Sequence, residues 1–136
     1  MAGYSGTPLV RKLGIGEGDV VAVRGAPPAF DALLGDLPEG ARIKRRATRP
    51  ADVVIAFFTS RARLAGACRG LGQTIHPDGA LWVAWPKKAS GVPTDVTEDV
   101  VREVALPLGL VDNKVCAIDD TWSGLRLVYR LSNRGR

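Results

Sequence analysis

The chain has 136 residues, of which 46% are hydrophobic and 24% are charged, as expected for one globular domain over residues 1–136. It lacks an apolar run of the ~18 residues that span a bilayer and a signal-peptide-like start, so we expect a cytoplasmic protein with no membrane partner. One histidine and two distant cysteines exclude a zinc site of the usual kind, so we expect no bound metal.

The first half of the chain alternates short apolar segments with turn signals and helical spacing. The run at 52–58 is apolar on both faces, as in a central parallel strand, whereas the basic run at 41–46 suits a sheet edge. In chain order, the sequence predicts a short helix near 8–13, a strand at 20–23, a helix at 30–37, an edge strand at 41–46 and a central strand at 52–58.

The second half continues the alternation. Ser60 is a candidate N-cap, and Asp95 and Glu98 have the spacing of a capping box. A turn over residues 120–124, with Trp122 expected to be exposed, separates the last two strands. The predicted elements are a helix from Ser60 past Leu71, a strand at 80–85, a helix at 95–108, and strands at 113–119 and 125–131.

Alternating strands and helices predict right-handed crossovers and a mostly parallel sheet. The last two strands form a hairpin, so one of them is antiparallel to the rest. We therefore expect an α/β fold with three layers, Rossmann-like, with a six-stranded sheet and three crossover helices.

Three segments carry a family resemblance: residues 13–23, His76-Pro77-Asp78-Gly79 and Gly109-Leu110-Val111-Asp112. In this order they resemble the entry to the first strand, the turn before the fifth strand and the start of the last two strands of a shortened class I S-adenosylmethionine-dependent methyltransferase. The resemblance implies the strand order 2-1-3-4-6-5. The segments 1–9, 85–88 and 121–124 also resemble a family of small actinobacterial proteins of unknown function, which implies no activity.

The chain departs from the methyltransferase pattern where the cofactor would bind. The glycine-rich turn is reduced to Gly25 followed by Ala26 and two prolines, and Ile43-Lys44-Arg45-Arg46 replaces the acidic end of strand two. No room remains between Arg46 and Asp52 for the helix–strand–helix unit that shapes the adenine pocket. We therefore expect no cofactor, and a cryptic methyltransferase ranks behind two other hypotheses.

The leading hypothesis is a non-catalytic module that binds an anionic small molecule or a partner at the carboxyl ends of the strands. Three loops at 25–28, 59–61 and 86–91 should meet there, with helix N-termini nearby. The competing interpretation is that Lys87 and Lys88 are solvated loop residues and bind no anion. The sequence identifies no catalytic residue. The candidate ligand-binding residues are Gly25, Thr59, Ser60, Trp85, Lys87, Lys88 and Ser90.

The alternative hypothesis is a nucleic-acid-associated protein, since the net charge is +5 and five cations fall within ten residues. No aromatic residue lies among them, so base stacking is not indicated. The competing interpretation is a solubilising edge strand. The five cations are Arg42, Lys44, Arg45, Arg46 and Arg49.

Overall fold

A computed structural model of the chain describes residues 7–46 and 48–130. The first six residues of the 1–9 segment, and the predicted end of the last strand at Leu131, lie outside the described residues. The strands are β1 (Val20–Arg24), β2 (Arg42–Lys44), β3 (Val53–Phe57), β4 (Ala80–Pro86), β5 (Leu110–Ala117) and β6 (Trp122–Tyr129). The helices are α1 (Leu9–Lys12), α2 (Phe30–Leu34), α3 (Arg61–Ile75) and α4 (Glu98–Ala105), with 3₁₀ turns η1 (Lys88–Ser90) and η2 (Leu106–Leu108).

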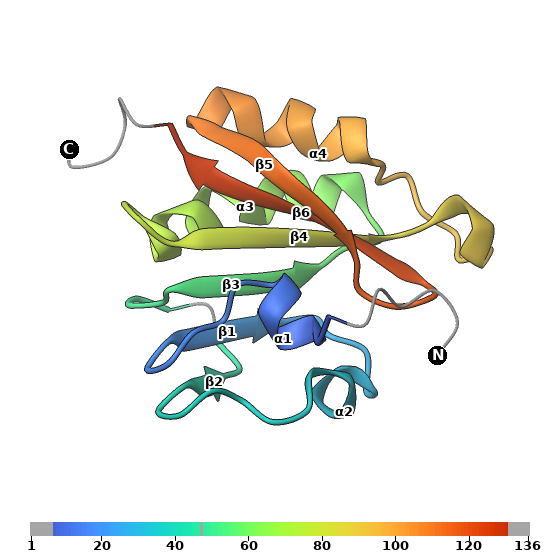
Figure 1. The fold of residues 1–136 in the computed structure, drawn as a ribbon. Coiled ribbons are helices and arrows are strands. Elements are labelled where there is room, and N and C mark those ends of the chain that lie inside the picture. Colours follow the sequence, from blue (N-terminus) through green and yellow to red (C-terminus); the bar gives the residue numbers. More distant parts are fainter. Residues whose placement is uncertain (1–6, 47, 131–136) are drawn as a thin grey trace.

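The six strands form one sheet in the order β2-β1-β3-β4-β6-β5 (Figure 1). The pairs β2–β1, β1–β3 and β3–β4 are parallel, whereas β6 is antiparallel to both β4 and β5. The expected fold class, strand order and antiparallel hairpin are therefore confirmed.

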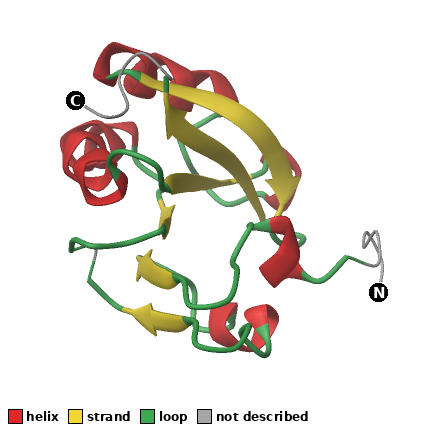
Figure 2. Cartoon of the chain, turned by 60° about the vertical axis from the view of Figure 1, so that its left-hand side comes forward, coloured by secondary structure: helices red, strands yellow, loops and turns green. Residues whose placement is uncertain are grey.

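Helices cover both faces of the sheet (Figure 2). One core lies between the sheet and α3 with α4, and includes Val54, Val83 and Trp85. The other lies between the sheet and α1 with α2, and includes Ile55 and Trp82. β3 and β4 are buried on both faces, which explains why their sequences are continuously apolar.

The indole of Trp82 links a central strand to the N-terminal helix. Its Nε1–H donates to the carbonyl oxygen of Leu13 at 2.9 Å in the interior. A tryptophan as fully buried as this one needs a partner for its N–H group, and here the partner is the carbonyl at the end of α1. Sixty-nine residues separate the two in sequence, so this bond sets where α1 lies on the sheet.

The connection from β2 to β3 contains no helix in its described residues. Instead, the Lys44 ammonium group donates to the Thr48 carbonyl at 2.5 Å, the Thr48 hydroxyl at 3.1 Å and the Pro50 carbonyl at 2.8 Å. Ala51 is 8% exposed and joins the same core as Ala22 of β1. We call residues 48–52 the strap. Lys44 holds it in place, and it covers part of the α3 side of β1.

Two predicted helix boundaries are wrong. α2 ends at Leu34 because Gly35 has a φ of +70°, so the predicted continuation to residue 37 does not form. α4 begins with Thr97 as N-cap, whose hydroxyl accepts from the Val100 N–H at 3.2 Å. The capping box predicted from Asp95 is therefore wrong.

The C-terminal hairpin begins three residues earlier than predicted. Asp119 Oδ1 accepts from the N–H groups of Thr121 and Trp122, at 2.8 and 2.7 Å, so this side chain closes the turn. Gly124 lies inside β6, where an added Cβ would come within 3.1 Å of the Trp82 ring. Trp122 is half-buried rather than exposed, and its ring packs edge-on against Phe57 with centroids 5.1 Å apart.

The described part of the chain has no helix long and apolar enough to cross a membrane. Of the two cysteines, Cys68 is fully buried, and burial raises its pKa to about 11. Cys116 is half-buried, and burial also raises its pKa. Both thiols are therefore protonated at neutral pH.

Gly79→Ala is expected to lower the free energy of unfolding by about 3 kcal/mol, because the new Cβ cannot be accommodated. It would lie 2.8 Å from the Asp52 carbonyl and 2.9 Å from the Ile75 backbone. Gly70→Ala is the matched control: its Cβ meets nothing within 4 Å, and the helix should gain up to ~1 kcal/mol. Urea unfolding of both variants tests this, and equal stability of the Gly79 variant and the wild type would contradict the packing described.

Candidate ligand-binding site

The turn after β1 needs its glycine. Gly25 has a φ of +70°, and an added Cβ would lie 3.1 Å from the Phe57 carbonyl oxygen. The next residues are Ala26, Pro27 and Pro28, and the prolines have no N–H to offer a ligand. α2, which follows, has only five residues and no side-chain cap. This turn therefore presents few hydrogen-bond donors.

The turn from β3 to α3 is occupied by the chain's own polar groups. The Ser60 hydroxyl accepts from the Arg63 N–H at 3.3 Å, and the Thr94 hydroxyl donates to the Thr59 carbonyl at 2.8 Å. Asp95 Oδ1 accepts from the Arg61 N–H at 2.6 Å. An internal carboxylate thus lies at the N-terminus of α3, where an external anion was expected.

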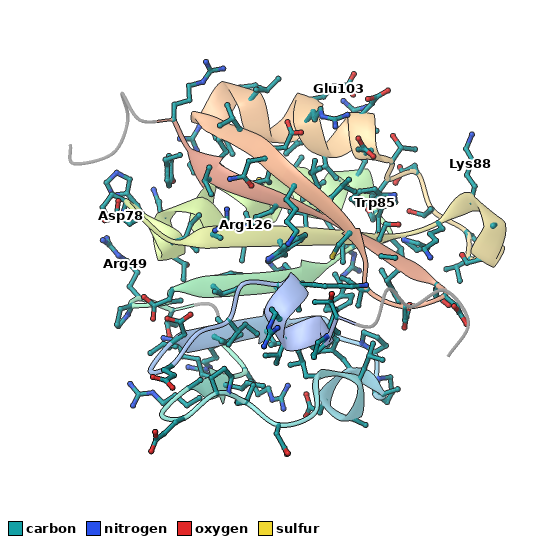
Figure 3. All side chains as sticks on the ribbon, in the orientation of Figure 1. Arg49, Asp78, Trp85, Lys88, Glu103 and Arg126 are labelled. Carbon is teal, nitrogen blue, oxygen red and sulfur yellow. The ribbon has the colours of Figure 1, made fainter. Side chains whose placement is uncertain are left out.

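The loop after β4 leads away from the sheet (Figure 1). The Lys88 side chain points into solvent, away from Trp85 (Figure 3). The Ser90 hydroxyl donates to the Lys87 carbonyl at 2.6 Å, and the Lys87 N–H donates to the Thr121 carbonyl at 2.8 Å. Trp85 is only 7% exposed and lies in the α3–α4 core. Internal hydrogen bonds thus engage polar groups of Ser60, Lys87 and Ser90, and Trp85 belongs to the core.

The basic cluster at 42–49 is also divided. Lys44 holds the strap, and Arg45 Nη2 lies 2.5 Å from Asp31 Oδ2 of α2. That hydrogen bond raises the pKa of Arg45. Arg42, Arg46 and Arg49 are exposed and form no ion pair with a described residue. Only these three remain available to an external anion.

A groove of about 460 Å³ lies between the end of β1 and the flank of α3. Alternation along β1 places Arg24 on the same face as Ala22, toward α3, and its guanidinium lies 5.4 Å from the Phe58 ring centroid. Arg24 and Arg63 form no ion pair with a described residue, whereas Arg61 pairs with Glu103 at 3.4 Å. The groove is lined by Arg24, Arg63, Gly66, Ala67, Gly70 and Leu71.

Two glycines of the groove have no packing reason to be glycine. A Cβ added at Gly66 or Gly70 would meet nothing within 4 Å, yet each glycine destabilises a helix interior by ~1 kcal/mol relative to alanine. Their absent side chains leave the backbone of α3 open along the groove. Sequence reasoning missed the groove; the available signals were Arg24 at the end of an apolar strand and two glycines four residues apart in a helix.

No protein-family model matches the sequence, and no curated protein sequence matches it. Solved structures do match. An S-adenosylmethionine-dependent methyltransferase from Aquifex aeolicus is 14% identical with a TM-score of 0.62, over 88% of this chain and 86% of that one. Fibrillarin from Aeropyrum pernix, in complex with S-adenosyl-L-methionine, is 16% identical with a TM-score of 0.59, over 93% and 70%.

A third match is magnesium protoporphyrin IX methyltransferase from Synechocystis PCC 6803, at 13% identity and a TM-score of 0.57, over 90% of this chain and 78% of that one. The fold is that of the S-adenosylmethionine-dependent methyltransferases. At these identities the likeness concerns the fold and leaves the chemistry to be argued from this chain's own residues.

Those residues do not fit the cofactor. The end of β2, where the methyltransferase pattern has a carboxylate for the ribose hydroxyls, carries Lys44 and Arg45, which cannot accept hydrogen bonds. Asp31, which reaches this region from α2, is already paired with Arg45. The turn after β1 has few N–H donors, and the end of β2 has no carboxylate. Both places therefore lack the groups that would hold the cofactor.

Lys44→Met is expected to lower the free energy of unfolding by about 1–2 kcal/mol, because it removes all the hydrogen bonds that hold the strap. Arg42→Met, on the same strand and face and without an ion pair, is the matched control and should change stability by less than ~0.5 kcal/mol. Guanidinium unfolding of both variants measures the difference, and equal losses would show that the strap does not depend on Lys44.

Proposed function

We propose that this chain is a non-catalytic ligand-binding module on a methyltransferase-like fold, and that its ligand is a small molecule bearing a phosphate group. The observation that carries the proposal is the groove between β1 and α3, where Arg24 and Arg63, which form no ion pair with a described residue, line one cavity beside two glycines of α3. Guanidinium groups bind phosphate oxygens with paired N–H donors, so Arg24 and Arg63 suit this ligand.

The size and surroundings of the groove support a small ligand. Its volume of about 460 Å³ is within the ~300–1,000 Å³ of typical small-molecule sites. None of its lining residues is acidic, and Asp95, at the nearby start of α3, is engaged by the Arg61 N–H. An anion entering the groove would therefore meet two guanidinium groups and no carboxylate among the described lining residues.

Methyl transfer is the less favoured interpretation. The ends of β1 and β2 lack the groups that would hold the cofactor, and the Ser60 hydroxyl is used as the α3 cap. The one histidine, His76, follows the C-terminus of α3, at the opposite edge of the sheet from the groove. These positions leave the groove without a positioned general base.

Arg24→Ala and Arg63→Ala should each weaken pyrophosphate binding ~10-fold or more, as expected for loss of a charge-assisted hydrogen bond. Isothermal titration calorimetry at low salt measures the affinity. Arg61→Ala is the control, because Arg61 lies in the same helical turn but is paired with Glu103; it should stay close to wild type. Absence of pyrophosphate binding by the wild type would refute the proposal.

Two further titrations locate and classify the site. The double variant Lys87→Ala/Lys88→Ala should keep wild-type affinity for pyrophosphate; a loss would move the site to the loop after β4. S-adenosylmethionine should give no heat with the wild type. A saturable micromolar signal would instead favour the cryptic methyltransferase.

The second candidate function is nucleic-acid association through the exposed members of the basic cluster. Arg42 of β2 pairs with Val20 of β1, and Val20 lies on the same face of β1 as Arg24. Arg42 therefore extends the cationic surface of this face beyond the groove. Neither Arg42 nor Arg46 forms an ion pair with a described residue. Such a surface would attract phosphodiesters without reading their sequence.

The double variant Arg42→Ala/Arg46→Ala should weaken binding to single-stranded RNA or duplex DNA and flatten its salt dependence, because fewer counterions are then released. Fluorescence anisotropy across a salt series measures both. Arg11→Ala/Lys88→Ala removes the same charge from other surfaces as a control. Absence of binding at low salt, or equal weakening in both double variants, would refute this candidate.

A further inference from the structure

Two adjoining cavities lie at the amino-terminal ends of the parallel strands, whereas the groove lies at the carboxyl end of β1. A cleft of about 390 Å³ is lined by Arg49, Gln73, His76 and Tyr129. Arg49 and His76 also line an adjoining cavity of about 460 Å³, which extends past the starts of β3 and β4 to Arg126. Figure 3 shows Arg49 and Asp78 at this edge, far from Lys88. The cleft is therefore separate from the site proposed above.

Three distant segments build the cleft. The strap after β2 carries Arg49, the residue that follows α3 is His76, and the end of β6 supplies Tyr129. The His76 and Tyr129 rings pack edge to face with centroids 4.9 Å apart. An added Cβ at Gly72 of α3 would lie 2.9 Å from the Tyr129 hydroxyl oxygen. The phenol is thus fixed against the helix backbone, and Gly72 is needed to admit it.

The described residues that line the cleft include several donors and no carboxylate. Arg49 carries a permanent charge, Gln73 and Tyr129 can donate, and the imidazole of His76 can donate from at least one nitrogen. Burial raises the pKa of Tyr129 and outweighs the opposing effect of Arg49 and Arg69, so the phenol keeps its proton at neutral pH. The two guanidinium groups nearby make the field positive.

Carboxylates do occur in the adjoining cavity, and two of them are engaged. Asp52 Oδ2 accepts from the Val20 N–H and Asp19 Oδ2 from the Gly16 N–H, each at 2.8 Å. Asp78 lies in the turn before β4, outside the cleft lining. The cleft thus offers positive charge and the adjoining cavity offers room beside it, which suits a ligand with one anionic end and a larger body.

We propose that this cleft is a second binding site, which takes the terminal carboxylate or phosphate of a small molecule, with Arg49 as the charged anchor and the uncharged phenol of Tyr129 as part of the wall. The site does not depend on the groove between Arg24 and Arg63. Its position at the opposite edge of the sheet lets the two sites be filled and disabled separately.

The test is an NMR titration of the ¹⁵N-labelled protein with inorganic phosphate and, separately, with succinate. Saturable shifts in the millimolar range or tighter should appear at residues 49, 73, 76 and 129. Arg49→Gln should weaken this binding ~10-fold or more, because it replaces the charged guanidinium group with an uncharged amide that can still donate a hydrogen bond. Tyr129→Phe keeps the ring packing against His76 and should weaken it by a smaller factor.

Two controls make the outcome specific. Arg46→Gln removes an exposed arginine three residues away and should leave the affinity within ~2-fold of wild type. The double variant Arg24→Ala/Arg63→Ala should keep the shifts at this cleft, so failure of the groove and failure of the cleft give different results. The proposal is overturned if no saturable shifts appear in the cleft, or if Arg46→Gln and Arg49→Gln weaken binding equally.

Discussion

The ammonium group of Lys44 is the constraint on which both proposed sites depend. By binding two carbonyls and a hydroxyl of the strap, it lets the chain pass from an edge strand to a central one without a helix. Without a helix there, the flank of α3 and the end of β1 stay open, and Arg24 faces a groove rather than a core. The same strap carries Arg49 to the opposite edge, where it meets the end of α3.

The chain engages, with its own side chains, polar groups near the carboxyl ends of its parallel strands. Asp95 binds the N-terminus of α3, and Arg45 pairs with Asp31 beyond β2. Both interactions stabilise the folded chain without a ligand. The chain thus has a sheet of methyltransferase type in which internal carboxylates occupy two positions near the strand ends, beside the cationic groove.

The sequence was sufficient to predict the strands and their order in the sheet. Buried parallel strands appear as continuous apolar runs, and segments with helical spacing of apolar residues separate them. Two boundaries were wrong where distant contacts decide them: Gly124 resembles a turn residue but makes room for Trp82, and Asp95 resembles a cap of its own helix but binds Arg61 of another. The end of α2 was wrong for a local reason, the positive φ of Gly35. The groove needed strand register and the path of the strap, so no local pattern could bring Arg24 and Arg63 together. Among the expected site residues, Ser60 was placed by a local rule, as the N-cap of α3, and Gly25 takes the positive φ that a glycine permits.

The place of β6 between β4 and β5 has a consequence for the order of folding. β5 is synthesised before β6, yet its only neighbour in the sheet is β6, so it must wait for a later segment before it can pair. During synthesis on the ribosome, the β4 edge would therefore stay unpaired after the four parallel strands have emerged. An apolar edge of that kind is prone to pair with other chains, so the interval before β6 arrives is when this protein is most exposed to aggregation.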